Sequence, residues 1–287
     1  MKIIRSKVLG FCMGVERAVE FANAESKRRK HIYSFGSLVH SSRVLSDLRK
    51  NGIKDMEELP RNLEDCSVII RAHGITPLEE KDLRARGAHV VDATCPIVKA
   101  SQMHAEDLAR AGYSIFLAGE AKHAEIEGIA GYAHNTASAS CILVSGAFEA
   151  GRAAKKLYCI KNDSKTALLG QTTIDEDEYG AIGEAIKLFF PNLEIFQTIC
   201  SATSIRQNAL RDLIEQTEAV IIIGGSESAN TRRLFAVAGG SGKPCILAED
   251  VSEIPDSFFS YGTVGISAGA STPDYLIDEF EKELLRH

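Results

Sequence analysis

The stretch GAHVVDATCPIVKAS, residues 87–101, decides how the rest of the chain is interpreted. A hydrophobic run leads up to Cys95 and a proline follows it at once, so the cysteine lies where a strand gives way to a loop. Groups displayed at such strand ends are often catalytic. One cysteine of this kind carries little weight, and the question is whether the chain repeats the arrangement.

The chain contains three copies of this arrangement, each made of a strand-like run, a cysteine and an amphipathic helix. The copies are LGFCMGVERAVEFA with Cys12, DATCPIVKASQMHAEDLA with Cys95 and QTICSATSIRQNALRDLI with Cys200. In each copy a second run leads into a polar loop, and one polar side chain lies 28 residues after the cysteine: His40, His123 and Ser228. A third run and loop close each copy, at His73, Thr172 and Ser271. Equal spacing of this kind indicates an internal repeat.

Helix-period stretches separate short apolar runs along the whole chain, which is typical of an α/β protein with largely parallel sheets. The predicted strands begin near residues 2, 31, 67, 89, 113, 166, 194, 219 and 263. We predict three pseudo-threefold-related α/β units with mostly parallel sheets, trefoil-like, around a central cavity. The predicted units are 13–96, 97–194 and 195–287, and the N-terminal strand at 1–12 carries the first cysteine. Since ligands of such units lie beyond the carboxyl ends of the strands, the three cysteines are expected to meet there.

The composition excludes several classes of protein. A chain of 287 residues that is 45% hydrophobic and 25% charged can bury real cores, and its net charge of -6 argues against a nucleic-acid partner. The apolar runs are far shorter than the roughly 20 residues that a bilayer-spanning helix needs, so no membrane contact is expected. Charged residues interrupt the N-terminal apolar region too early for a signal peptide, which predicts a cytoplasmic protein.

Cysteine usage points to reduced thiols and not to a disulfide framework, because seven cysteines is an odd number and they are not closely paired. Three thiolates gathered at one vertex suit either zinc or an iron–sulfur cluster, and the spacing alone identifies neither. A four-iron cluster with three cysteine ligands would leave one iron open to substrate. The other four cysteines adjoin apolar runs and are expected to be small buried side chains: Cys66, Cys141, Cys159 and Cys245.

Polar side chains in the repeat loops are candidates for binding a ligand. They are His40, His73, His123, Thr172, Thr173, Ser228, Asn230, Ser271 and one carboxylate, Glu125. Each has a plainer interpretation: Ser228, Ser271 and the QTT loop would cap helices, and Glu125 would be an ordinary first-turn acid. The two interpretations are compatible, because a capped helix N-terminus also attracts anions, and several around one cavity indicate a phosphate-bearing ligand. The other histidines are expected to be structural or solvated: His31, His89, His104, His134 and His287.

With these residues assembled, the chain closely resembles the LytB family of hydroxymethylbutenyl diphosphate reductases, enzymes of the methylerythritol phosphate route to isoprenoid precursors. Nine motifs carry the resemblance, in family order: GFCMGVERAV, LVH, RAHG, DATCP, the HxEIEG loop, QTT, TIC with ATSIRQ, SANTRRL and SAGASTPD. Two positions depart from the common pattern. Ala124 stands where many members have proline, and Ala229 stands where many have a second serine.

The resemblance implies a three-lobed α/β fold and one 4Fe-4S cluster with three cysteine ligands, Cys12, Cys95 and Cys200, whose open apical iron meets the substrate's hydroxyl group. It also implies that Thr172 lies beside the substrate alcohol, that Glu125 is the proton source and that the diphosphate is held by His40, His73, His123, Ser228, Asn230 and Ser271. The implied reaction is a two-electron reductive removal of the allylic hydroxyl, giving isopentenyl and dimethylallyl diphosphates. Reduced flavodoxin or ferredoxin is the implied electron donor.

Two other classes of protein remain as alternatives. A non-catalytic iron–sulfur electron carrier or redox sensor would share the cysteines but would need neither a phosphate-binding site nor Glu125. A zinc-dependent hydrolase would share the cysteine and histidine loops but would be colourless. A thiol or disulfide enzyme is disfavoured because the chain has no CxxC sequence.

Overall fold

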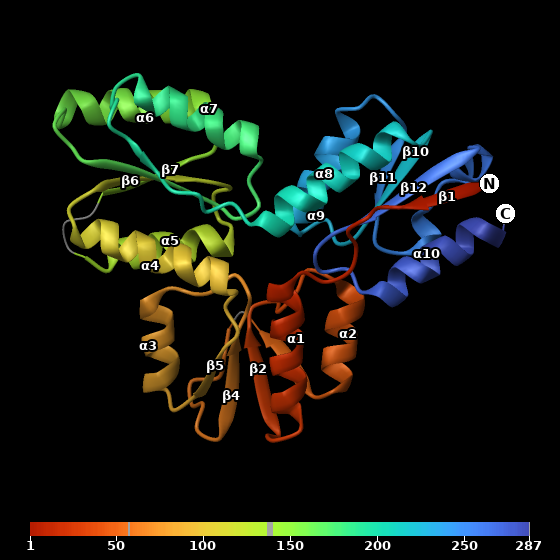
Figure 1. Ribbon diagram of the computed structural model, residues 1–287. Coiled ribbons are helices and arrows are strands. Elements are labelled where there is room, and N and C mark those ends of the chain that lie inside the picture. The colour runs from red at the N-terminus through yellow and green to blue at the C-terminus, as the bar shows by residue number, and fades with distance from the viewer. Residues whose placement is uncertain (57, 137–139, 287) are drawn as a thin grey trace. The chain divides into compact units, whose positions relative to one another are not determined.

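The computed structural model describes residues 1–56, 58–136 and 140–286, and it divides into two compact units. Unit 1 comprises Met1–Glu57 and Ser201–His287, and unit 2 comprises Glu58–Cys200. In both units short strands alternate with helices along the chain (Figure 1). The predicted boundaries at 13–96, 97–194 and 195–287 stay a prediction.

Unit 1 is built on a sheet of parallel strands in the order β1-β12-β10-β11. The strands are β1 (Lys2–Arg5), β10 (Ala219–Ile223), β11 (Cys245–Ala248) and β12 (Thr263–Ala268). A further parallel pair joins β2 (His31–Phe35) to β3 (Ile53–Met56). The helices are α1 (Met13–Ser26), α2 (Ser42–Lys50), α8 (Ser201–Glu215), α9 (Ala229–Gly239) and α10 (Asp274–Arg286), with 3-10 turns at Val251–Glu253 and Asp256–Ser260.

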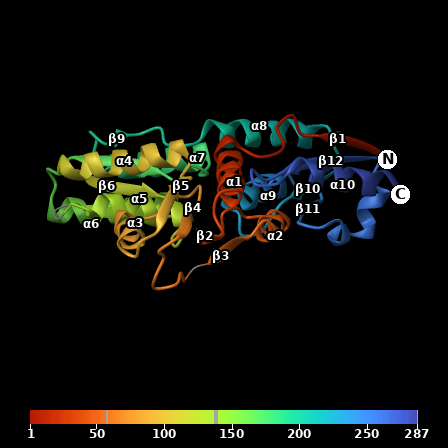
Figure 2. The ribbon, with the colours of Figure 1, turned by 90° about the horizontal axis from the view of Figure 1, so that it is seen from below.

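The two faces of β10 are buried against different helices, because successive side chains of a strand point to opposite faces. Ile221 packs in one core with residues of α10, and Ile222 packs in another with residues of α8 and α9. Every residue of β10 is buried, which explains why its sequence AVIII is continuously apolar. The helix α2 packs beside β3 (Figure 2).

Unit 2 has a sheet of the same kind, with parallel strands in the order β7-β6-β8-β9. Its strands are β6 (Ser114–Ala118), β7 (Ser140–Val144), β8 (Thr166–Gly170) and β9 (Glu194–Ile195). A further parallel pair joins β4 (Cys66–Ile70) to β5 (His89–Asp92). The helices are α3 (Pro77–Ala85), α4 (Pro96–Arg110), α5 (Ala124–His134), α6 (Ala147–Ile160) and α7 (Glu176–Lys187).

The sheet of unit 2 is covered on both faces (Figure 1). Ile115 packs with residues of α4 and α5, and its neighbour Phe116 packs with residues of α6 and α7. Local sequence sets where the helices start. Thr76 and Glu79 form a reciprocal capping box at the start of α3, and Pro77 occupies its first turn.

Three strands of the structure are missing from the sequence prediction: β3, β7 and β11. They occupy the same place in each repeat, since β3 pairs with β2, β7 with β6 and β11 with β10. Each of the three ends its sheet in the strand order. The prediction therefore omitted one edge strand in every copy.

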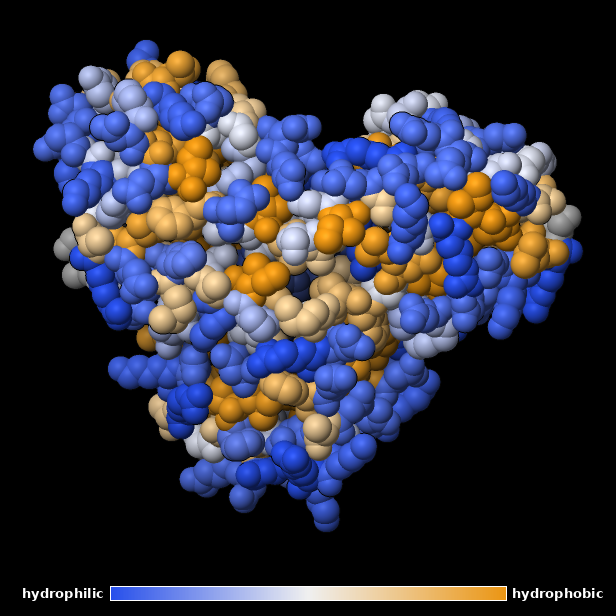
Figure 3. Space-filling model, viewed as in Figure 1, coloured by the Kyte–Doolittle hydropathy of each residue, from blue (hydrophilic) through white to orange (hydrophobic). Residues whose placement is uncertain are grey.

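In the described residues, no helix combines the length and the apolar character that crossing a bilayer requires. Hydrophilic residues spread over most of the face in Figure 3, with smaller hydrophobic patches between them. Scattered surface hydrophobic residues of this kind are normal in folded chains.

Candidate active site

A buried carboxyl group lies at the start of α5. Glu125 is the second residue of this helix, and it is only 1% exposed. Its Oε1 accepts a hydrogen bond from the backbone N–H of Thr172 at 2.6 Å, and its Oε2 accepts one from the Thr172 hydroxyl at 2.9 Å. Burial raises the pKa of Glu125 to about 7, although both hydrogen bonds favour the charged form. A carboxyl group with this pKa exchanges protons near neutral pH, which suits a general acid.

Two of the predicted histidines lie next to each other in unit 2. The rings of His73 and His123 meet edge to face, with centroids 5.3 Å apart. His123 caps α5, because its Nδ1 accepts the backbone N–H of Glu125 at 3.3 Å, and a neutral ring then carries its hydrogen on Nε2. Gly74 has a φ of +74°, and a Cβ there would lie 2.3 Å from Nε2 of Gln102. The loop that presents His73 therefore requires glycine at this position.

The side chain of Gln171 ties the loop after β8 to the loop after β6. It is 2% exposed, and its Oε1 accepts the backbone N–H of Glu120 at 2.9 Å. Its Nε2 donates to the hydroxyl of Thr173 at 3.0 Å. The sequence analysis did not include Gln171 among the site residues. Its only sequence signal was its place as the first residue of the QTT motif.

The three predicted cysteine ligands share one backbone contact. Each cysteine follows one strand of a parallel pair: Cys12 follows β1, which pairs with β12, Cys95 follows β5, which pairs with β4, and Cys200 follows β9, which pairs with β8. In each case the backbone N–H of the cysteine donates to the carbonyl oxygen of the residue two positions after the end of the other strand. The N···O distances are 2.9 Å for Cys95 to Ala72, 2.9 Å for Cys200 to Thr172 and 3.0 Å for Cys12 to Ala270. The repeat seen in the sequence is therefore present in the hydrogen bonds as well.

The thiols have the chemistry that a soft metal group requires. None of the seven cysteines, all of which the structure describes, forms a disulfide, and Cys12 and Cys95 precede helices without capping them through the side chain. Within either unit, the described residues contain no group of three His, Cys, Asp or Glu side chains arranged to hold a metal ion. Cys12 belongs to unit 1, and Cys95 and Cys200 belong to unit 2. The three-cysteine set stays a prediction.

In unit 1 the start of α9 holds two candidate residues. The hydroxyl oxygen of Ser228 accepts the backbone N–H of Thr231 at 3.3 Å, so Ser228 caps the helix as predicted. Asn230 is 7% exposed, and its Nδ2 has no hydrogen-bond partner in the part of the chain that the structure describes. A buried amide donor without a partner is costly unless a ligand accepts its hydrogen bond.

A second pair of candidates in unit 1 joins the loops after β2 and β12. The hydroxyl of Ser271 donates to the carbonyl oxygen of His40 at 3.3 Å. A Cβ at Gly225 would lie 2.6 Å from the same oxygen, so the loop after β10 approaches it closely. His40, His123 and Ser228 each lie five residues after the end of a strand, which is the equivalence that their spacing predicts.

Several minor predictions are wrong. Ser271 does not cap α10, because that helix begins at Asp274, and the QTT loop does not cap α7, whose cap is Asp175. Cys159 is exposed on α6, and the other three cysteines outside the repeat are only partly buried. Apolar neighbours in sequence are a poor guide here. Cys141 and Cys245 lie on the edge strands β7 and β11, Cys66 begins β4, and Cys159 lies near the end of α6.

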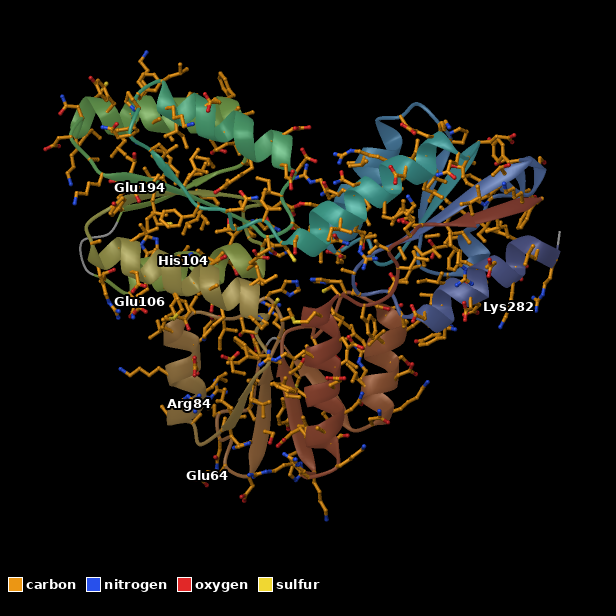
Figure 4. All side chains as sticks on the ribbon, viewed as in Figure 1. Glu64, Arg84, His104, Glu106, Glu194 and Lys282 are labelled. Carbon is orange, nitrogen blue, oxygen red and sulfur yellow. The ribbon has the colours of Figure 1, made fainter. Side chains whose placement is uncertain are left out.

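The histidines outside the repeat loops were expected to be structural or solvated. Those that the structure describes are exposed: His31, His89, His104 and His134. His104 lies on α4, where its ring contacts Phe196 (Figure 4). His287 lies outside the described residues.

Known proteins with the same sequence pattern and fold were found by comparison. A family model described as "LytB protein" matches residues 3–285. The chain is 42% identical to 4-hydroxy-3-methylbut-2-enyl diphosphate reductase of Treponema denticola, with 99% of each chain covered. It is 34% identical to the protein of that name from Geotalea uraniireducens, with 99% of this chain and 97% of the relative covered.

Two solved structures share the fold. The E-1-hydroxy-2-methyl-but-2-enyl-4-diphosphate reductase of Plasmodium falciparum matches with a TM-score of 0.88 and 25% identity, over 98% of this chain and 87% of that chain. A structure titled (E)-4-hydroxy-3-methyl-but-2-enyl diphosphate reductase, the terminal enzyme of the non-mevalonate pathway, matches with a TM-score of 0.72 and 34% identity. That match covers 100% of this chain and 99% of the other.

Fold and site together define a class of protein: a parallel α/β enzyme that displays soft thiol donors and acid–base groups after its strands. The matches over nearly the whole chain then identify the family. The chain belongs to the LytB family, whose members are iron–sulfur oxidoreductases. The matched structures confirm the predicted fold class of repeated parallel-sheet α/β units.

Proposed function

We infer that this chain is a 4-hydroxy-3-methylbut-2-enyl diphosphate reductase, the enzyme of the last step of the methylerythritol phosphate route. Relatives of this name match it from end to end. The structural observation that carries the inference is the buried carboxyl group of Glu125, whose pKa of about 7 suits a proton donor. An electron carrier or a redox sensor has no use for such a group, which disfavours that alternative.

The reaction consumes two electrons and two protons: the alcohol R–OH becomes R–H, and the hydroxyl oxygen leaves as water. The allylic C–O bond breaks, and a C–H bond forms at one end or the other of the allyl fragment. Formation at one end gives isopentenyl diphosphate, and formation at the other gives dimethylallyl diphosphate. A proton must therefore be delivered to the leaving oxygen inside the site.

Glu125 is the proton donor in this proposal. Its carboxyl group is held by two hydrogen bonds from Thr172, so its position does not depend on the substrate. The Thr172 hydroxyl lies 2.9 Å from Oε2 of Glu125, which lets it orient both the carboxyl group and the substrate alcohol. Only the protonated acid can donate, so activity should fall as pH rises through about 7.

Cys12, Cys95 and Cys200 are proposed to hold one 4Fe-4S cluster that has a fourth, open iron. When bound, the cluster supplies electrons and a Lewis-acid site for the hydroxyl oxygen. The free thiols and their common backbone anchors support this assignment. Backbone anchoring of each cysteine would fix the direction of its Cα–Cβ bond before the cluster is inserted.

The diphosphate is proposed to bind to six polar residues: His40, His73, His123, Ser228, Asn230 and Ser271. Thr173 is proposed as a further substrate-binding residue. Two observations support the set. His123 and Ser228 cap the helices α5 and α9, and the N-terminus of a helix attracts anions through its free N–H groups. The buried Nδ2 of Asn230 offers a donor that no described residue uses.

The electron donor and the location complete the proposal. A reduced flavodoxin or ferredoxin would deliver electrons one at a time, as an iron–sulfur centre accepts them. A cytoplasmic location suits seven cysteines that form no disulfide, because thiols stay reduced in that compartment.

The proposed function is tested on anaerobically purified protein. We would record its visible spectrum and its iron and sulfide content, then add hydroxymethylbutenyl diphosphate with reduced methyl viologen and follow oxidation of the dye. The proposal predicts a brown protein with about four irons per chain that oxidises the dye only when substrate is present. A colourless, zinc-loaded protein would contradict the cluster, and a brown protein without turnover would favour the carrier or sensor.

A further inference from the structure

Arg206 is a buried cation that the proposed reaction leaves unexplained. It lies on α8 and is 3% exposed. In the part of the chain that the structure describes, no carboxylate pairs with its guanidinium, which donates instead to backbone carbonyls, those of Val8, Gly10 and Ala268. Arginine keeps its charge at any physiological pH. A buried charge is expensive unless it is paired and hydrogen bonded, so this one needs a reason.

The contacts of Arg206 surround the backbone that holds Cys12. Its Nη2 donates to Gly10, two residues before Cys12, at 3.0 Å. Its Nη1 donates at 2.9 Å to Ala268, two residues before the Ala270 carbonyl that accepts the N–H of Cys12. The planar guanidinium therefore links both segments of chain that position this cysteine.

The loop that carries Cys12 is tightly packed at Gly10. This glycine has a φ of +74°, and a Cβ at its position would lie 2.5 Å from Oδ1 of Asp274. The loop thus has two independent supports, the close approach at Gly10 and the hydrogen bonds of Arg206. Only the second support brings a positive charge.

The guanidinium of Arg206 lies beside the segment that carries Cys12, because it donates to the carbonyl oxygen of Gly10, two residues before that cysteine. Burial lowers the pKa of Arg206, so a negative charge nearby would favour its charged form. Backbone carbonyls contribute partial charges but no full counter-charge. A cluster held by three thiolates carries a net negative charge, and reduction adds another electron. A fixed positive charge close to one ligand stabilises the reduced state more than the oxidised state.

We propose that Arg206 is a positioning residue that holds the Cys12 loop and supplies a counter-charge for reduction of the bound cluster. The inference rests on the proposed function, since it requires a cluster on Cys12. Arg206 acts through Cys12 and is not assigned a contact with substrate. Its helix α8 starts at the residue after Cys200, so the same helix that carries the charge also follows a second predicted ligand in sequence.

The test is a redox titration of the cluster-loaded, full-length protein, followed by electron paramagnetic resonance, together with the iron content per chain. Arg206→Met removes the charge and the hydrogen bonds. The ratio of reduced to oxidised cluster at a fixed solution potential should fall roughly tenfold, as expected for losing about one unit charge near the site. Arg206→Lys keeps the charge, so its ratio should stay close to that of the unchanged chain even if less iron is bound.

Gly10→Ala is the matched control for the loop. It strains the same segment without changing any charge, so it should lower iron content and leave the reduced-to-oxidised ratio of the remaining cluster unchanged. An Arg206→Met protein with full iron and an unchanged ratio would overturn the inference. If that variant does not fold, Arg206→Gln takes its place. Equal ratios of reduced to oxidised cluster in the Arg206→Gln and Arg206→Lys proteins would then also overturn the inference. An unchanged chain that binds no cluster would instead defeat the proposed function.

Discussion

Glu125 and Glu127 lie on the same turn of α5, and only Glu125 is buried. Replacing Glu125 by Gln preserves the shape of the side chain but removes the acid. We expect kcat to fall by about 10²- to 10⁴-fold while the visible spectrum of the cluster is unchanged. Glu127→Gln is the matched control and should keep normal activity. A Glu125→Gln enzyme with near-normal kcat in anaerobic dye oxidation would remove Glu125 from the role of proton donor.

The ionisation of Glu125 also links stability to pH. Its pKa is the ordinary 4.5 in the unfolded chain and about 7 in the folded chain. The folded protein holds more protons between these values, so this group makes the free energy of unfolding decrease as pH rises from about 4.5 to about 7, with no further change above that range. Between about pH 5.5 and about pH 8, the decrease should be about 2 kcal/mol.

Anaerobic urea unfolding of the native chain and of Glu125→Gln at these two pH values measures the effect. The variant should lack this part of the pH dependence. Its free energy of unfolding, compared with that of the native chain, should therefore be higher at the higher pH than at the lower pH. The same pH dependence in both proteins would show that the carboxyl group is not buried in solution.

The sequence predicts the functional roles of some single residues better than those of others. Glu125 could be found because it follows His123 in a repeat loop, but its pKa depends on burial, which no local pattern encodes. Gln171 and Arg206 lie within the QTT and ATSIRQ motifs, but neither motif indicates what their side chains contact. Their importance comes from hydrogen bonds to backbone groups of loops that are distant in the sequence.

At the scale of elements, the start of α5 determines how Glu125 is presented. Ala124 is the first residue of this helix, where a backbone N–H has no partner inside the helix and proline is favoured. His123 before it has an extended ψ of 132°, which is compatible with a following proline. Ala124→Pro, the residue common in the family, should therefore raise the free energy of unfolding by about 0.4–1 kcal/mol.

Urea unfolding and kcat together check this prediction, and kcat should stay unchanged. Ala130→Pro, in the interior of the same helix, is the control and should cost about 3 kcal/mol or more. A clear loss of stability or activity in Ala124→Pro would mean that this chain holds its helix start differently from its relatives.

The sequence predicted the central strands and the edge strands β1, β5 and β9, but it missed the edge strands β3, β7 and β11. Central strands such as β6, β8 and β10 are buried at every residue, so their sequences are continuously apolar. The edge strands β3, β7 and β11 are short and partly exposed, and β3 reads IKDM. Strand β3 has charged residues at its centre, whereas β7 and β11 carry the apolar runs CILV and CILA. Apolar runs this brief do not distinguish a strand from another buried segment.

At the scale of the whole molecule, the repeat places each predicted ligand by the same backbone contact. The sequence predicted three equivalent cysteines, whereas the anchoring carbonyls of Ala72, Thr172 and Ala270 required the structure. Each carbonyl follows a strand that pairs with the strand before the cysteine. The order of strands in the sheet determines which carbonyl that is, and the spacing of residues in the sequence does not.

Cysteine replacement tests the set of ligands. Cys95→Ser should lose most of the visible absorbance and bound iron, because a hydroxyl is a poor ligand for iron that prefers thiolate. Cys159 is exposed on α6 and has no place in the repeat, so Cys159→Ser should keep colour, iron content and activity. Equal iron content in the two variants would contradict the assignment of Cys95.

The central claim is that this chain removes the hydroxyl group of hydroxymethylbutenyl diphosphate by reduction. The most direct measurement is to reduce the cluster-loaded protein anaerobically, mix it with that substrate and identify the products by mass spectrometry. The account predicts isopentenyl and dimethylallyl diphosphates, with no product from Glu125→Gln on the same time scale. Recovery of unchanged substrate from a protein whose cluster is intact and reduced would contradict it.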